Sequence, residues 1–178
     1  MKRQLRTQRG SAIAEFGGAM MIFVCFFLAP IIDISFVPIR YLIANGVANE
    51  VIHRVALTEN RSDAYDQLND GWWRNFLGNC GVMVHEPTLS VIVLGKNDGD
   101  RLVVSHSTPI TPNWLPGGDK GPCTYSLELS FDADVPPLVH GSAGLPGFTS
   151  PLLISFKSRS QWENLGRDPQ TGEFYINE

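Results

Sequence analysis

The longest hydrophobic stretch of the chain lies near its N-terminus. From Phe16 to Ile32 there are 17 residues without a charge. A helix of this length measures roughly 26 Å, and one that begins at Ser11 has enough residues to cross the hydrocarbon core of a bilayer. In that longer helix, Glu15 is the one charge before Ile32. A carboxylate inside a membrane segment is costly and by default indicates function. The pattern predicts one membrane-spanning helix with a functional acid near its start.

A second helical pattern follows Pro38 and continues to about Thr58. Its apolar residues recur at three- and four-residue spacing, which predicts an amphipathic stalk helix: Ile39, Leu42, Ile43, Val47, Val51 and Val55. Pro38 lacks an N–H and its ring crowds the preceding turn, so we expect a kink or break there. The stripe is expected to pack mainly on the chain's own domain.

A short helix is predicted over residues 64–76, interrupted near Gly71. Ser62 is the expected N-cap, with Asp63 in the first turn. The aromatic residues at 72, 73 and 76 could form an exposed binding patch. Such side chains more often cover a sheet, so packing in the core is the preferred interpretation.

From residue 81 the hydrophobic period changes from helical to two. Residues 89–94 and 101–105 flank a turn signal at 97–99, which predicts a hairpin. Residues 125–131 and 152–158 alternate in the same way and predict a third and a fourth strand. Proline- and glycine-rich segments at 109–122 and 136–151 are expected to be surface loops. The predicted fold class is α+β: a long N-terminal helix followed by a small antiparallel β-sheet domain.

The distribution of charge predicts how the membrane helix is oriented. The chain has a formal net charge of −4, yet its first ten residues hold four cations and no acid. Without these ten residues the number of Lys+Arg falls from 14 to 10 against 18 Asp+Glu, and the formal net charge becomes −8. That balance argues against a broad nucleic-acid surface. The positive-inside rule places the N-terminus in the cytoplasm and the residues after about 38 outside.

The segment Arg9-Gly10-Ser11-Ala12-Ile13-Ala14-Glu15-Phe16 carries a family resemblance. A cut after Gly10 would make Ser11 the first residue and Glu15 the fifth, followed by an aromatic. This resembles the class III leader of type IV pilins and, more narrowly, the TadE-like minor pilins of tight-adherence (Tad) pili. The resemblance covers about residues 9–52. Gly17, Gly18, Pro30 and Asp33 depart from the usual run, and residues 145–148 and 158–163 add a weaker likeness to the C-terminal part of TadE-like proteins.

The resemblance implies a pilin-like fold with a leader at 1–10, a transmembrane and stalk helix at 11–58 and an extracytoplasmic domain at 59–165. The polar residues after Gly166, with Pro169 and Gly172, indicate a C-terminal tail at 166–178 that is loosely held or packs late. Prepilin peptidase would cut between Gly10 and Ser11. The freed amine of Ser11 would pair with a neighbour's Glu15, beside Phe16, in the assembled pilus.

Implied partners are the prepilin peptidase, the major pilin, other minor pilins and the assembly ATPase with its platform protein. The implied location is the inner membrane, single-pass with a periplasmic C-terminal domain, and the extracellular pilus.

Three other interpretations fit parts of the pattern. A plain signal anchor would hold Glu15 in the headgroup layer. A secretory signal peptide is disfavoured because no A-x-A site follows the apolar core and Pro30 stands where small residues are needed. The alternative function is an uncleaved bitopic envelope protein with a β-rich domain that binds a ligand or partner.

The three cysteines fall into two groups. Cys25 lies in the predicted span and reads as a small apolar residue. Cys80 and Cys123 fall on the outer side, where oxidation is permitted. They predict one disulfide that stabilises by roughly 3–4 kcal/mol, against the alternative of two free, buried thiols.

No catalytic or metal-binding motif stands out. The chain lacks G-x-S-x-G, P-loop, H-E-x-x-H and C-x-x-C patterns. His53, His85, His106 and His140 are scattered. Residues 96–100 resemble a calcium loop only faintly, and a plain turn is preferred. We therefore expect no enzyme, no cofactor and no metal site.

Overall fold

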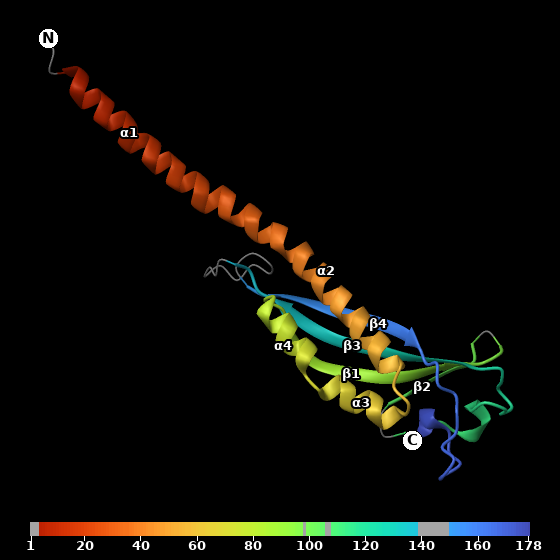
Figure 1. Ribbon diagram of the computed structural model, residues 1–178. Helices are drawn as coiled ribbons and strands as arrows, with labels where there is room; N and C mark the ends of the chain where they lie inside the picture. Colours follow the sequence, from red (N-terminus) through yellow and green to blue (C-terminus); the bar gives the residue numbers. More distant parts are fainter. Residues whose placement is uncertain (1–3, 98, 106–107, 139–149) are drawn as a thin grey trace. The chain divides into compact units, whose positions relative to one another are not determined.

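The computed structural model describes residues 4–97, 99–105, 108–138 and 150–178, with only the backbone for residues 4–12. The chain divides into two compact units, residues 1–39 with 136–152 and residues 40–135 with 153–178. Along the chain the elements are α1 (Gln4–Phe23), the π-helix η1 (Val24–Leu28), α2 (Ala29–Ala56), α3 (Arg61–Asn69), α4 (Trp72–Asn79), β1 (Met83–Leu94), β2 (Arg101–Val104), η2 (Pro112–Trp114), β3 (Thr124–Val135), β4 (Leu152–Gln161) and η3 (Tyr175–Asn177) (Figure 1).

The N-terminal helix stays helical through both of its prolines. Ahead of Pro30 the backbone widens into the π-helix η1, where the N–H of Ala29 bonds the carbonyl of Val24. A wide turn gives the proline ring room against the turn before it. Pro38 lies inside α2 without ending it, so of the predicted kink or break the break does not occur. A proline removes one backbone hydrogen bond, and the long helix on either side absorbs that loss.

The second unit is built on a four-stranded antiparallel sheet in the order β2-β1-β3-β4. β1 pairs along its whole length with β3, from Met83 opposite Asp134 to Leu94 opposite Thr124. Its last four residues also pair with β2, which confirms the predicted hairpin. The four predicted strands are present, and β1 begins six residues before the predicted start.

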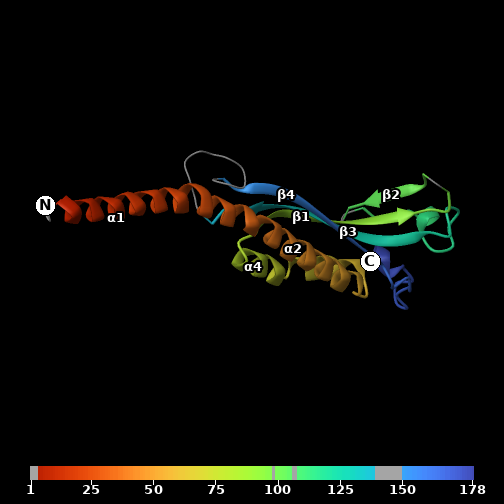
Figure 2. The same cartoon turned by 90° about the horizontal axis from the view of Figure 1, so that it is seen from above.

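Helices cover one face of this sheet. The second half of α2, together with α3 and α4, lies on the same side of the strands (Figures 1 and 2). The buried stripe of α2 includes two alanines, which let the helix approach closely: Ala44, Ala48, Val51, Ile52 and Val55. The predicted stripe was therefore right at Val51 and Val55 but wrong at Ile39 and Leu42, which are 50% and 67% exposed.

Helices α3 and α4 are separated at Gly71, as predicted, where φ is +74° and a side chain would be strained. The N-cap of α3 is Asn60, not the predicted Ser62, because the side chain of Asn60 accepts the Asp63 N–H at 2.8 Å. Trp73 is fully buried and donates from Nε1 to the carbonyl of Leu68 at 3.0 Å. The prediction that these aromatic residues pack in the core is therefore confirmed for Trp73.

The C-terminal segment 166–178 packs on the second unit, which corrects the expectation that it is loosely held. Ile176 in η3 is fully buried. The side chain of Asn177 accepts the Ile110 N–H at 2.6 Å and donates to the Ile110 carbonyl at 3.1 Å. The Glu178 carbonyl accepts the Ser62 N–H at 3.0 Å. The tail belongs to the domain.

Candidate functional site: the apolar N-terminal helix

The residues of the predicted processing motif lie in one helix. Gly10 and Ser11 are part of α1, and Glu15 and Phe16 follow one turn after Ser11. Phe16 is 67% exposed, and Ile13 before it is also exposed. The helix therefore presents apolar side chains outward on both sides of the carboxylate.

This outward apolar surface continues along α1, η1 and the first part of α2. The exposed side chains are large and uncharged: Met20, Met21, Ile22, Phe23, Val24, Phe26, Phe27, Leu28, Ile31, Ile32, Ile34 and Phe36. Among the described residues one helix, followed from Ile13 to Ala56, is long and apolar enough to span a membrane. Burying such a surface in lipid removes its contact with water.

Asp33 is the first charged residue after the uncharged run, and its side chain has a protein partner that the sequence pattern does not indicate. Its side chain is only 3% exposed, and Oδ1 accepts the N–H of Leu138 at 2.8 Å. Both residues belong to the first unit. The carboxylate thus ties the segment after β3 to the helix and has a protein partner. Residues 145–148, which carried part of the family resemblance, lie outside the described residues.

The predicted disulfide between Cys80 and Cys123 is wrong, because all three cysteines are free thiols. Cys80 precedes the start of β1, whereas Cys123 stands beside the end of β1, where Leu94 pairs with Thr124. Those two ends are about 36 Å apart along a twelve-residue strand. A bridge needs Cα atoms within roughly 7 Å.

We therefore expect Cys80 and Cys123 to react with a maleimide without prior reduction. Burial is the main cause that raises the pKa of the Cys123 thiol. Its labelling rate should keep rising as the pH passes the usual thiol range, since the thiolate is the reactive form. The measurement is mass spectrometry of labelled peptides across a pH series. Labelling of Cys80 and Cys123 only after reduction would show instead that the two residues form a disulfide.

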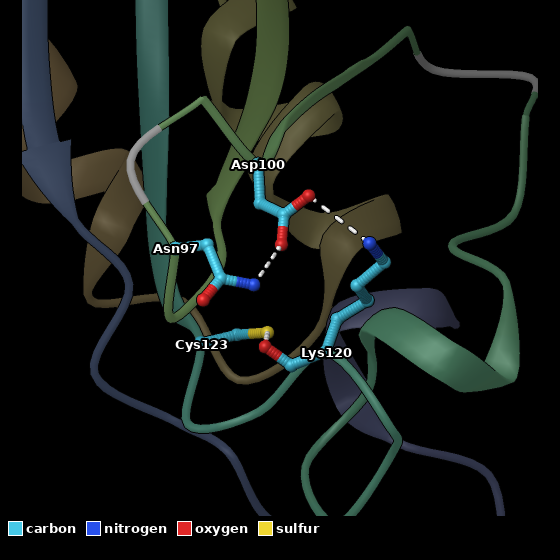
Figure 3. A network of polar contacts seen from close by, with 4 residues as sticks. All are labelled: Asn97, Asp100, Lys120 and Cys123. Atoms are coloured by element: carbon cyan, nitrogen blue, oxygen red, sulfur yellow. Dashed lines mark hydrogen bonds and ion pairs between the residues drawn. The ribbon is translucent and has the colours of Figure 1, made fainter.

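The hairpin loop after β1 is held by polar contacts within the loop and to the segment before β3. Asp100 accepts hydrogen bonds from Lys120 Nζ at 3.0 Å and from Asn97 Nδ2 at 3.1 Å, as Figure 3 shows. The bond from Lys120, followed by the one from Asn97, lowers the pKa of Asp100. Cys123 Sγ donates to the Lys120 carbonyl at 3.4 Å. The Asp100 carboxylate thus joins this loop to the segment before β3. Asp98 lies outside the described residues.

The histidines do not converge on one site within the described residues. His53 is exposed on α2, and His85 Nε2 lies 2.8 Å from Oδ2 of Asp134. His106 and His140 fall outside those residues.

A shallow apolar groove of about 310 Å³ separates α2 from α4. Trp72 and Phe76, which are 39% and 47% exposed, form one wall, and Gly46 and Val47 lie on the other. The Arg54 guanidinium stands 5.1 Å above the Trp72 ring and pairs with Glu50 at 2.6 Å. The expectation that the whole aromatic cluster is buried was wrong for these two residues.

Comparison of the chain with protein-family models, with curated proteins and with solved structures finds no match in any of the three.

Proposed function

We propose that this chain is a non-enzymatic minor pilin or pseudopilin of a Tad-type pilus, cut by prepilin peptidase between Gly10 and Ser11. The observation that carries the proposal is the register of four features: a basic leader, Gly10, Glu15 five residues later and a long apolar helix. The exposed apolar surface of that helix supports a role in which lipid, and later other helices, surround it.

The rest of the chain fits the same role. The excess of cations before the apolar run that starts at Phe16 favours a cytoplasmic N-terminus, which puts the α+β domain on the periplasmic side. The free amine of Ser11 and the carboxylate of a neighbour's Glu15 would then meet among apolar helices, where pairing is strongly preferred over an isolated charge. The partners would be the major pilin, other minor pilins and the assembly machinery.

Replacing Gly10 by valine should block processing. A protease cleft must accept extended backbone on both sides of the cut, and a β-branched side chain at this position crowds it. The uncut chain keeps ten more residues and migrates about 1 kDa above the mature form, since the 178 residues weigh 19.7 kDa. Immunoblots of cells with an active prepilin peptidase measure the shift.

Gly17→Val is the matched control for this experiment. Gly17 lies in the same helix, and no neighbouring atom lies within 4 Å of a Cβ added there. This variant should be processed normally. Normal processing of Gly10→Val as well would place the cut elsewhere, or favour the uncleaved bitopic protein.

A further inference from the structure

Strand β1 contains a strained bulge in its first half. The pairing with β3 shifts between His85 and Thr88. Within the bulge Glu86 has φ +33°, and it is the one non-glycine residue with positive φ among those the structure describes. A left-handed glutamate costs free energy and persists only where its surroundings hold it. Bulges of this kind redirect side chains and often stand beside binding sites.

The bulge borders a groove of about 390 Å³, within the size range of small-molecule sites. Phe131 and Phe156 line part of it, and three strands contribute the polar residues: His85, Glu86, Thr88, Ser130, Asp132, Ser155 and Lys157. We call this the outer groove. It lies wholly within the second unit.

Several of these side chains are held by neighbours on the sheet. Thr88 Oγ1 and Ser130 Oγ are 2.8 Å apart. Ser155 Oγ donates to Oδ1 of Asp132 at 2.6 Å. Because cross-strand contacts fix their orientation, the hydroxyls and the Asp132 carboxylate form an ordered array. Each retains hydrogen-bonding capacity toward solvent, including the second oxygen of Asp132.

Lys157 differs from the other cation of β4. Arg159 is paired with Glu128 at 2.8 Å, directly across to β3. Lys157, two residues earlier on the same face, has no ion-pair partner among the residues that the structure describes. The outer groove thus combines an ammonium donor, carboxylate acceptors and hydroxyls that can do both.

We propose that the outer groove binds a neutral saccharide. Sugar hydroxyls donate to the carboxylates of Asp132 and Glu86 while accepting from Lys157 and the serine and threonine hydroxyls, so one ligand satisfies both kinds of group. An anion is disfavoured by the carboxylates in and beside the groove. This binding goes beyond the proposed pilin function and holds whether or not residues 1–10 are removed.

The test uses the full chain in a detergent without a sugar headgroup. Saturation-transfer NMR is recorded with the methyl pyranosides of glucose, galactose and mannose and with N-acetylglucosamine, each at roughly 10 mM to detect millimolar affinity. At least one sugar should receive saturation. Lys157→Met and Asp132→Asn should each weaken its affinity about tenfold or more, since each removes a charge-assisted hydrogen bond.

Lys96→Met is the matched control, because Lys96 is an exposed lysine on the hairpin loop outside the groove, and its binding should equal that of the wild type. Tryptophan fluorescence confirms that each variant is folded. The proposal is overturned if no sugar receives saturation from the folded chain, if Lys157→Met binds as well as the wild type, or if inorganic phosphate alone binds.

Discussion

Replacing Glu15 by alanine should give a chain that is cut normally after Gly10 but no longer joins the pilus. The proposed cut lies five residues earlier, at the membrane face, so we expect the carboxylate to contribute little to cleavage. In the assembled state Glu15 would be surrounded by apolar helices, and pairing with a Ser11 amine is what stabilises it there. Its loss leaves that amine unpaired. We expect the variant to stay in the inner membrane and to fail to co-purify with the major pilin.

Two further variants separate charge from side-chain size. Glu15→Gln keeps the shape but not the charge and should fail in the same way as alanine. Glu59→Ala removes an exposed acid from the loop between α2 and α3 and should assemble normally. The readouts are N-terminal sequencing and pull-down with the major pilin. A Glu15→Ala chain recovered with its partners at wild-type yield would place the carboxylate in the headgroup layer only.

Ile176→Ala should strongly destabilise the second unit although Ile176 lies only two residues before Glu178. The side chain is fully buried, and truncation of a buried isoleucine costs about 2–5 kcal/mol through lost burial and the cavity left behind. Asn177→Ala should also lower the stability of the second unit, but through lost hydrogen bonds. It removes both hydrogen bonds to the buried Ile110 and leaves backbone groups without partners.

Denaturant unfolding followed by tryptophan fluorescence measures this effect, because all four tryptophans lie in the second unit. Leu165→Ala is the control. Leu165 is 40% exposed in the segment before the tail, so its truncation should change stability far less. An Ile176→Ala chain with the wild-type midpoint would mean that the tail does not stabilise the domain.

The strands could be predicted because apolar and polar residues alternate along their sequences. Residues 125–131 alternate in the sequence, and in β3 all odd-numbered residues from Tyr125 to Val135 are buried, together with Ser126 among the even-numbered ones. The hairpin followed from turn chemistry at 97–99. The helix long and apolar enough to span a membrane followed from a long uncharged run, which requires no knowledge of the tertiary structure. These are local signals.

The missed features depend on contacts between distant residues. The buried stripe of α2 falls on Ala44 and Ala48, which a hydrophobic pattern underweights because alanine is small. Nothing in a polar C-terminal sequence indicates that Asn177 bonds Ile110. The separation of Cys80 from Cys123 became visible only when β1 and β3 were paired in register.

Asp33 is the clearest case at the candidate site. In the sequence it reads as an interruption of an apolar helix. In the structure its carboxylate accepts a backbone N–H from Leu138, 105 residues later. Periodicity cannot reveal such a contact because the partner is a backbone group.

The mature N-terminus is the most direct test of the proposed function. The full-length chain is expressed in cells with an active prepilin peptidase and in cells that lack it, and the purified protein is sequenced from its N-terminus. Cleavage at Gly10 predicts a chain that begins at Ser11 in the first cells and an uncut leader in the second. A chain that still begins at Met1 in cells with an active peptidase would contradict the pilin proposal.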